Sequence, residues 1–162
     1  MYAQIDTSGV QVPPDLAEFC RPGTASLRAT GAHPSGSGDS GEPLSATDLY
    51  REKNSRLDQP VRCVVRRAEE WAALWSAMTR QVSAASPPPP VDFERAMVLV
   101  AGMGIQPSTG YGIGVADVRR TANTIEATVL RYTPGLCTVG MAETEPVHAV
   151  SIPRENTPIQ FI

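Results

Sequence analysis

Two residues near the C-terminal end of the sequence could combine as a nucleophile and a base. Cys137 lies in the loop-like stretch "TPGLCTVG", and His148 lies on the strand-like run that follows it. Catalysis by a thiolate needs a base within reach and an electropositive setting. Nothing in the sequence brings the two side chains into contact, and a lone thiol or histidine is more often structural. A small thiol enzyme that uses Cys137 and His148 is therefore the last of the function hypotheses.

A serine motif in the N-terminal part also suggests catalysis. The run "GDSGEP" at 38–43 resembles the active-site serine motif of chymotrypsin-type proteases, and His33 precedes Ser40. In that family the histidine lies far upstream of the serine on a much longer double barrel, and its second glycine is replaced here by Glu42. A Ser-His-Asp arrangement needs a rigid scaffold to position it. We interpret the motif as a chance occurrence in a Gly/Ser-rich loop and predict no enzymatic activity.

The segment "GMGIQPSTGYGIGV" at 102–115 contains five glycines. A phosphate-binding loop needs G-x-x-x-x-G-K-[ST], or G-x-G-x-x-G between a strand and a helix. Here no lysine follows, and the next element is strand-like. The first interpretation is a tight turn, with residues 103–110 exposed between two antiparallel strands and Gly110 supplying a positive φ or a close backbone approach. The second is a loop that a partner protein contacts through Gln106, Pro107, Ser108, Thr109, Gly110 and Tyr111.

The periodicity of the sequence predicts the elements that must position these residues. Over 66–80, Trp71, Leu74, Trp75 and Met78 share one face of an amphipathic helix and are expected to pack in the core. Apolar runs predict six or seven strands, at 25–31, 61–66, 95–103, 110–118, 123–132, 145–153 and 157–162. The predicted fold class is α+β, mainly antiparallel β, with the helix packed on the sheet.

The sequence divides into an N-terminal arm and a single domain. Residues 1–24 carry three prolines and little periodicity, which indicates an irregular arm. Residues 25–162 form the domain, with a polar loop insertion at about 33–60 that holds a helical turn near 46–52. The run "SAASPPPP" at 83–90 is a stiff polyproline spacer.

Composition excludes several classes of function. The net charge is −3, the 14 basic residues are scattered, and the longest apolar run, at 96–103, is too short to span a bilayer. We therefore expect no nucleic-acid partner and no transmembrane segment. Cys20, Cys63 and Cys137 lack the spacing of a zinc site, so we predict no metal and no cofactor. Whether one disulfide forms, and between which two cysteines, stays open. The first 25 residues, as written, contain no secretory signal.

Five short motifs in a fixed order resemble the C-terminal domain of PrcB, a non-catalytic lipoprotein subunit of a bacterial surface protease complex. They are "VRCVVRRAEEWAALWSAM", "PPPPVDFERAMVLVAGMG", "QPSTGYGIGVADV", "TVLRYTPG" and "EPVHAVSIPR", within 61–162, with a looser match at 25–41. Where this family has Thr-Gly-Gly-Tyr, the chain has a single glycine, Gly110, before Tyr111. The resemblance implies a protein-interaction role without catalytic residues, and export to the periplasm or cell surface.

The run "QPSTGYGI" also resembles a loop of chagasin-type inhibitors, which insert it from an immunoglobulin-like sandwich into the cleft of papain-like cysteine proteases. Gln106 replaces that family's asparagine, and its other loop motifs are absent. Three functions are therefore ranked. The first is a non-enzymatic binding module that assists or restrains a protease. The second is a chagasin-like inhibitor that uses residues 106–111, and the third is the thiol enzyme.

Overall fold

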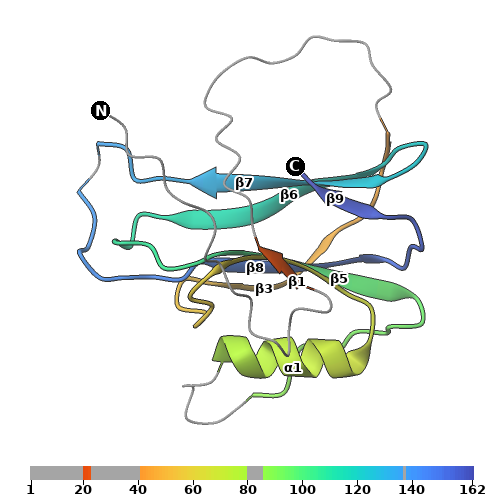
Figure 1. Ribbon diagram of the computed structural model, residues 1–162, viewed down its shortest axis with the longest axis horizontal. Coiled ribbons are helices and arrows are strands. Elements are labelled where there is room, and N and C mark those ends of the chain that lie inside the picture. Colours follow the sequence, from red (N-terminus) through yellow and green to blue (C-terminus); the bar gives the residue numbers. More distant parts are fainter. Residues whose placement is uncertain (1–19, 23–40, 80–85, 137) are drawn as a thin grey trace.

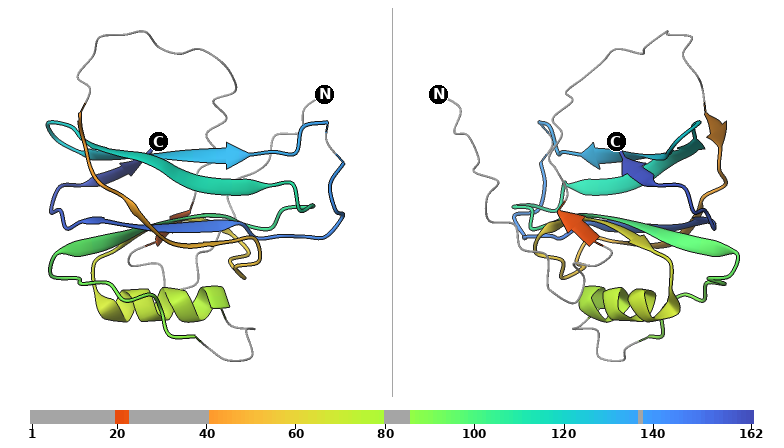
Figure 2. Two further views of the ribbon diagram at one scale, coloured as in Figure 1. Left: turned by 180° about the vertical axis from the view of Figure 1, so that it is seen from behind. Right: turned by 45° about the vertical axis from the view of Figure 1, so that its right-hand side comes forward.

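The computed structural model describes residues 20–22, 41–79, 86–136 and 138–162. They form three stacked layers, namely a helix, a five-stranded sheet and a four-stranded sheet (Figure 1). The sheets face each other as a sandwich, and α1 (Ala68–Thr79) covers the outer face of the larger one. Figure 2 shows the same layers from two further sides. The predicted α+β class, mainly antiparallel β with one helix on the sheet, is confirmed.

The larger sheet, called sheet A, is antiparallel throughout. Its order is β1 (Cys20–Pro22), β4 (Pro60–Val65), β5 (Ala96–Met103), β8 (Val147–Pro153) and β3 (Thr47–Glu52). Strand β5 is central and almost wholly buried, as its continuous apolar run predicts, because one of its faces meets the helix layer and the other meets the second sheet.

The smaller sheet, called sheet B, has short outer strands. Its order is β2 (Glu42–Pro43), β6 (Gly112–Arg120), β7 (Ile125–Tyr132) and β9 (Ile159–Phe161). Strands β6 and β7, both at predicted strand positions, form an antiparallel hairpin. Strand β2 pairs only with Arg119 and Arg120 of β6, and β9 pairs in parallel with β7 over three residues. Within the described residues, most of both outer edges of sheet B therefore lacks a neighbouring strand.

Two apolar cores hold the layers together. Between α1 and sheet A lie Trp71, Leu74, Trp75 and Met78, all buried as predicted. Their two indole N–H groups donate to the carbonyls of Pro89 and Ser86, so no indole polar group is left unpaired. The second core lies between the sheets and contains Met97, Leu99, Ala101, Met103, Ile113, Val115, Val118, Ile125, Ala127, Val150 and Ile152.

The N-terminal part differs from its prediction. The arm is not irregular throughout, because residues 20–22 form β1, which a disulfide between Cys20 and Cys63 joins to β4. The polar stretch at 33–60 is not one loop, since it contains β2 and β3. Residues 47–52 are a strand rather than a helical turn, because hydrogen bonds to β8 decide their conformation and local propensity does not. The predicted strand at 25–31, His33 and Ser40 lie outside the described residues.

Candidate partner-binding site

Three segments meet at one end of the sandwich, at the left of Figure 1: residues 53–59, 104–111 and 133–146. We call them together the loop end. The strand register brings them there, since β4 begins, β5 ends and β8 begins at the same level of sheet A. In sheet B, Gly112 at the start of β6 pairs with Tyr132 at the end of β7.

Residues 106–111, the predicted contact residues, lie in the loop end but do not form a hairpin. Strands β5 and β6 belong to different sheets, so the segment between them crosses from sheet A to sheet B. The hairpin prediction is wrong because β4 and β8 already flank β5 and leave no edge for β6. The expected exposure holds only in part, since Ser108 is 6 % exposed. Strand β6 begins directly after Tyr111, one residue from the predicted start.

Hydrogen bonds fix this segment against residues 140–144. The backbones of Gln106 and Thr144 exchange two bonds, of 2.7 and 3.0 Å. The Thr109 N–H donates to the Gly140 carbonyl at 3.0 Å, and the Gly140 N–H donates to Thr109 Oγ1 at 3.0 Å. Thr144 Oγ1 donates to the carbonyl of Ser108 at 2.9 Å. The predicted contact loop is therefore one side of a short, irregular ladder.

Two glycines permit this arrangement in different ways. Gly104 has a φ of 72°, so the positive φ expected at Gly110 lies there instead. Gly110 allows the close approach that was the alternative expectation. A Cβ at this position would lie 2.4 Å from Cβ of Pro134 and 2.6 Å from Cγ1 of Val139. The two loops can therefore touch only because residue 110 has no side chain.

Residues 53–59 complete the unit. Ser55 donates twice to the Glu145 carbonyl, from N–H at 3.1 Å and from Oγ at 2.6 Å. The Glu145 N–H donates to the Lys53 carbonyl at 2.6 Å, and Lys53 Nζ donates to the Thr109 carbonyl at 3.2 Å. These partners lie 90 residues apart for Ser55 and Glu145 and 56 residues apart for Lys53 and Thr109, so no local pattern in the sequence could indicate them.

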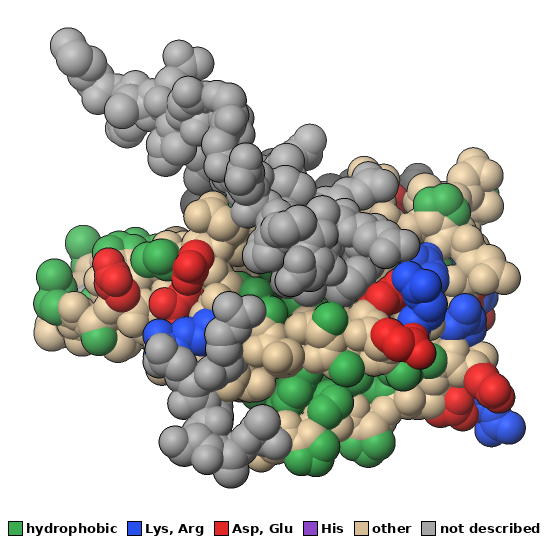
Figure 3. Space-filling view, turned by 60° about the horizontal axis from the view of Figure 1, so that its bottom comes forward, with side chains coloured by type: hydrophobic (Ala, Val, Ile, Leu, Met, Phe, Trp, Pro, Cys, Tyr) green, Lys and Arg blue, Asp and Glu red, His purple; other side chains and the backbone are tan. Residues whose placement is uncertain are grey.

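The loop end presents apolar side chains to solvent. Leu136 is fully exposed, Met141 is 89 % exposed and Ile105 is 48 % exposed. Figure 3 shows hydrophobic side chains gathered at the left, the end at which Figure 1 shows the loops. Exposed apolar side chains that gather in one place mark interaction sites more often than chance placement does. What this end of the sandwich can do chemically is bind a complementary apolar surface.

Apart from residues 53–59 and β4, the loop end and the strands that carry it lie in the stretch of sequence from β5 to β8. Residues 97–153 match the family described as PrcB C-terminal. The resemblance inferred from the five motifs is thereby confirmed over these four strands and two of the three segments of the loop end. No curated protein and no solved structure matches the chain.

His148 lies in the PrcB C-terminal segment but is fully buried between the sheets. Its Nδ1 accepts a hydrogen bond from the Val115 N–H at 2.9 Å, and its Nε2 lies 2.9 Å from Asp48 Oδ1. Since Nδ1 accepts, the ring proton resides on Nε2 and is donated to Asp48. The guanidinium of Arg51 lies 3.0 Å from Nε2, and its Nη1 donates to the Ile113 carbonyl at 3.4 Å.

This environment favours the neutral imidazole. Burial, and after it the charge of Arg51, lower the pKa of His148, while Asp48 acts in the opposite direction. With both ring nitrogens engaged, His148 joins β8 to the edge of β6 and has no free nitrogen to act as a base. Cys137, its predicted partner, lies outside the described residues. Asp48 and Arg51 escaped sequence reasoning because about 100 residues separate them from His148.

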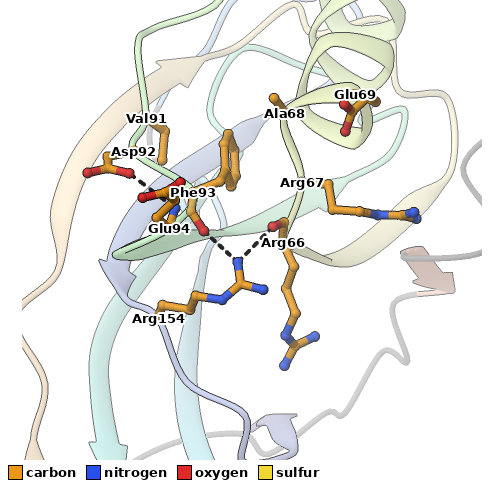
Figure 4. A pocket seen from close by; sticks show the side chains of 9 residues that line it. All are labelled: Arg66, Arg67, Ala68, Glu69, Val91, Asp92, Phe93, Glu94 and Arg154. Carbon is orange, nitrogen blue, oxygen red and sulfur yellow. Dashed lines mark hydrogen bonds between the residues drawn. The ribbon is translucent and has the colours of Figure 1, made fainter.

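A hollow of about 590 Å³ lies between the start of α1 and residues 91–94, at the end of sheet A opposite the loop end (Figure 4). Arg154 Nη1 donates to the carbonyls of Phe93 and Arg66, at 2.5 and 3.0 Å, and so ties two segments together. The side chains of Arg66 and Arg67 point away from Phe93 in Figure 4. Acidic residues line the same hollow, so it presents no single charge to a ligand.

The described residues contain no group of three or more His, Cys, Asp or Glu side chains placed to hold a metal ion. No helix among them has the length and apolar character needed to cross a membrane.

Proposed function

We propose that this chain is a non-enzymatic protein-binding module that associates with a protease and contacts it through the loop end. The observation that carries the proposal is the exposure of Leu136 and Met141, together with the hydrogen bonds that hold the loop beside Met141 in place. The match to the PrcB C-terminal family supports a protease as the class of partner.

Binding at the loop end would bury apolar surface at a low cost in conformational entropy. Burying exposed aliphatic side chains in a partner is favourable by about 25 cal/mol per Å² of apolar surface. The loop that carries Met141 is already fixed by the bonds of Gly140 and Thr144, so little conformational entropy remains to be lost there. Pro107 and Thr109, from the predicted set, border the same surface and would contact the partner.

Affinity capture with matched variants tests the proposal. The full chain is immobilised and exposed to the surface and secreted proteins of its own cell, and retained protease is identified by activity and mass spectrometry. We expect a Leu136→Asp, Met141→Asp double variant to retain about tenfold less protease than the wild type. An Ala72→Asp, Ala73→Asp double variant adds the same charge on the exposed face of α1 and should retain as much as the wild type. Failure of the wild type to retain a protease would contradict the function, and equal retention by the loop-end variant would contradict the site.

The chagasin-like alternative makes a different prediction. An inhibitory loop must enter a cleft, but residues 106–111 are tied to residues 140–144, and Ser108 is buried. We therefore expect no inhibition of papain by the wild type at high micromolar concentration. Inhibition that Thr109→Ala weakens, without loss of folding stability, would revive the inhibitor hypothesis.

We propose no catalytic step for this chain. The thiol-enzyme hypothesis needs His148 as a base, and that imidazole already binds Val115 and Asp48. A broad protease and esterase screen of the wild type should find no activity. Activity abolished by Cys137→Ala or by Ser40→Ala would reveal a catalytic site.

The disulfide supports a location outside the reducing cytosol. Cys20 and Cys63 form a buried bridge across β1 and β4, and disulfides of this kind persist in oxidising compartments. We infer that the chain matures in such a compartment, in agreement with the export implied by the family resemblance. Thiol labelling after rapid acid quenching of cells should leave Cys20 and Cys63 unlabelled. Full labelling of both would contradict the inference.

A further inference from the structure

Among the described residues, no strand continues the pairing along the outer edge of β7 beyond the end of β9. The N–H of Ile125 and that of Val129 donate to carbonyls of the 158–162 segment, at 2.8 and 2.7 Å, so these residues direct their backbone groups away from β6. Hydrogen bonding alternates along an antiparallel strand, so Arg131 directs its N–H and carbonyl the same way. Within the described residues these two groups have no partner. The row of hydrogen bonds that β9 makes can therefore be continued by another chain.

One arginine from each sheet faces the space between the sheets near this edge. On β7 the side chains of Ile125, Ala127 and Val129 face the core between the sheets, and Arg131 continues that alternation beyond it. Arg62 lies on the side of β4 that faces the same space, since Val61 and Cys63 face the helix. Burial, and after it the charge of Arg131, lower the pKa of Arg62 to about 10. The strand register places both arginines at the same end of this space, since Arg62 lies near the start of β4 and Arg131 near the end of β7.

Neither arginine has an acidic partner among the described residues. Arg62 Nη1 donates to the carbonyls of Val61 and Gly102, at 2.7 and 2.8 Å, which leaves its charge uncompensated. Arg131 is exposed and makes no hydrogen bond or ion pair within the described part of the chain. In a chain with a net charge of −3, two neighbouring unpaired arginines form a local positive site.

We propose that this site receives an extended segment of the partner protein, which pairs with the β7 edge at Arg131 and places a carboxylate between Arg131 and Arg62. Backbone pairing supplies the strand-to-strand contact, and the arginine pair selects an acidic side chain. Leu130 and Tyr132 flank Arg131, are about half exposed and lie next to the loop end, so the segment continues the proposed contact surface. This inference rests on the proposed function, because it names the chemistry of the partner at an extension of the same site.

Nuclear magnetic resonance with a defined peptide pair tests the inference. The ¹⁵N-labelled full chain is titrated with acetyl-Thr-Val-Glu-Val-Thr-Val-amide and with the same peptide carrying Gln in place of Glu. We expect the Glu peptide to shift the amides of residues 129–133 and the Arg62 Nε–H, with a Kd about tenfold lower than that of the Gln peptide. In the Arg131→Gln variant the two peptides should bind equally. Arg66→Gln, which removes the same charge at the far end of β4, should keep the preference.

Each outcome decides the inference. Equal binding of both peptides to the wild type, or a preference that persists in Arg131→Gln, would overturn it. Inorganic phosphate probes the charge site separately. If phosphate displaces the Glu peptide completely, and by itself shifts only the resonances of the arginine side chains, the charge site is supported. Peptide shifts confined to those side chains, with none in the β7 backbone, would overturn the strand pairing. If Arg131→Gln retains the protease in the capture experiment while the loop-end variant loses it, the inference fails and the proposed function stands.

Discussion

Within the described part of the chain, sheet B has two edges that lack a full neighbouring strand, and different groups lie beside each of them. At β6, beyond the short pairing with β2, the Val115 N–H donates to His148 and the Ile113 carbonyl accepts from Arg51. Side chains of sheet A thus close this edge. At β7, beyond the short pairing with β9, Arg131 has no such partner within the described residues. We call these the closed edge and the open edge.

The difference shows how one sheet separates stability from recognition. Exposed edges invite pairing with other chains, and proteins protect those that serve no purpose. The closed edge is protected by polar side chains that are themselves satisfied. The open edge carries a positive charge at its centre, which disfavours pairing with most segments and permits pairing with an acidic one. The closed edge should therefore respond to mutation in stability, and the open edge in binding.

The largest effect is expected for His148→Ala at the closed edge. The substitution leaves the Val115 N–H without a partner and creates a cavity between the sheets, which should cost about 3 kcal/mol of unfolding free energy. Urea denaturation measures the change. His148→Asn can still accept from Val115 and should recover part of the loss. A loss below about 1 kcal/mol for the alanine variant would show that the edge does not depend on this side chain.

A smaller effect of the same origin is expected from pH. The folded chain lowers the pKa of His148 below its ordinary value of about 6.5, because burial and Arg51 disfavour the charged form. The unfolded chain therefore binds the proton more readily, and the contribution of His148 is complete above that value. It is lost as the pH falls through about 6.5 toward the lower folded pKa. Unfolding free energies measured between about pH 7.5 and 5 should fall for the wild type and fall less for His148→Asn. Parallel profiles would contradict this origin.

Gly114→Ala should have a moderate effect at the closed edge. A Cβ there would lie 3.1 Å from Arg51 Nη1, so the guanidinium must move and its bond to the Ile113 carbonyl weakens. We expect a loss of about 1 kcal/mol. Gly112→Ala on the same strand is the matched control. A Cβ at residue 112 would have Tyr132 Cδ2 as its nearest neighbour, at 3.5 Å, which is an ordinary van der Waals contact. Equal losses of unfolding free energy in both variants would show that alanine in the strand, and not the displacement of Arg51, causes the loss.

The smallest effect on stability is expected at the open edge. Arg131→Gln removes a charge that has no acidic partner within the described residues and lies near Arg62. The free energy of unfolding, measured by thermal denaturation, should change by less than about 0.5 kcal/mol. It can rise slightly, because the repulsion between Arg131 and Arg62 is relieved. A loss comparable to that of His148→Ala would mean that the open edge is a structural element, and the contrast between the two edges would disappear.

Several elements could be predicted from sequence because their signals are local. The apolar face of α1, the buried run of β5 and the hairpin of β6 and β7 each occupy a single stretch with the right period. The close approach at Gly110 was also anticipated, although its partners, Pro134 and Val139, were not. Strands β1, β2 and β3 were missed because they are short, polar or proline-bearing, and their conformation depends on pairing with distant strands.

The sequence by itself determined the fold class and the buried face of the helix. It could do so because apolar periodicity and turn chemistry act over a few neighbouring residues. Only the tertiary structure decided which sheet each strand joins. That choice sent the 104–111 segment from one sheet to the other instead of around a hairpin. It also brought His148 to Asp48, which lies 100 positions away along the chain. Within the described residues it left the β7 edge without a neighbouring strand beyond Ala127, because that depends on where β9 ends.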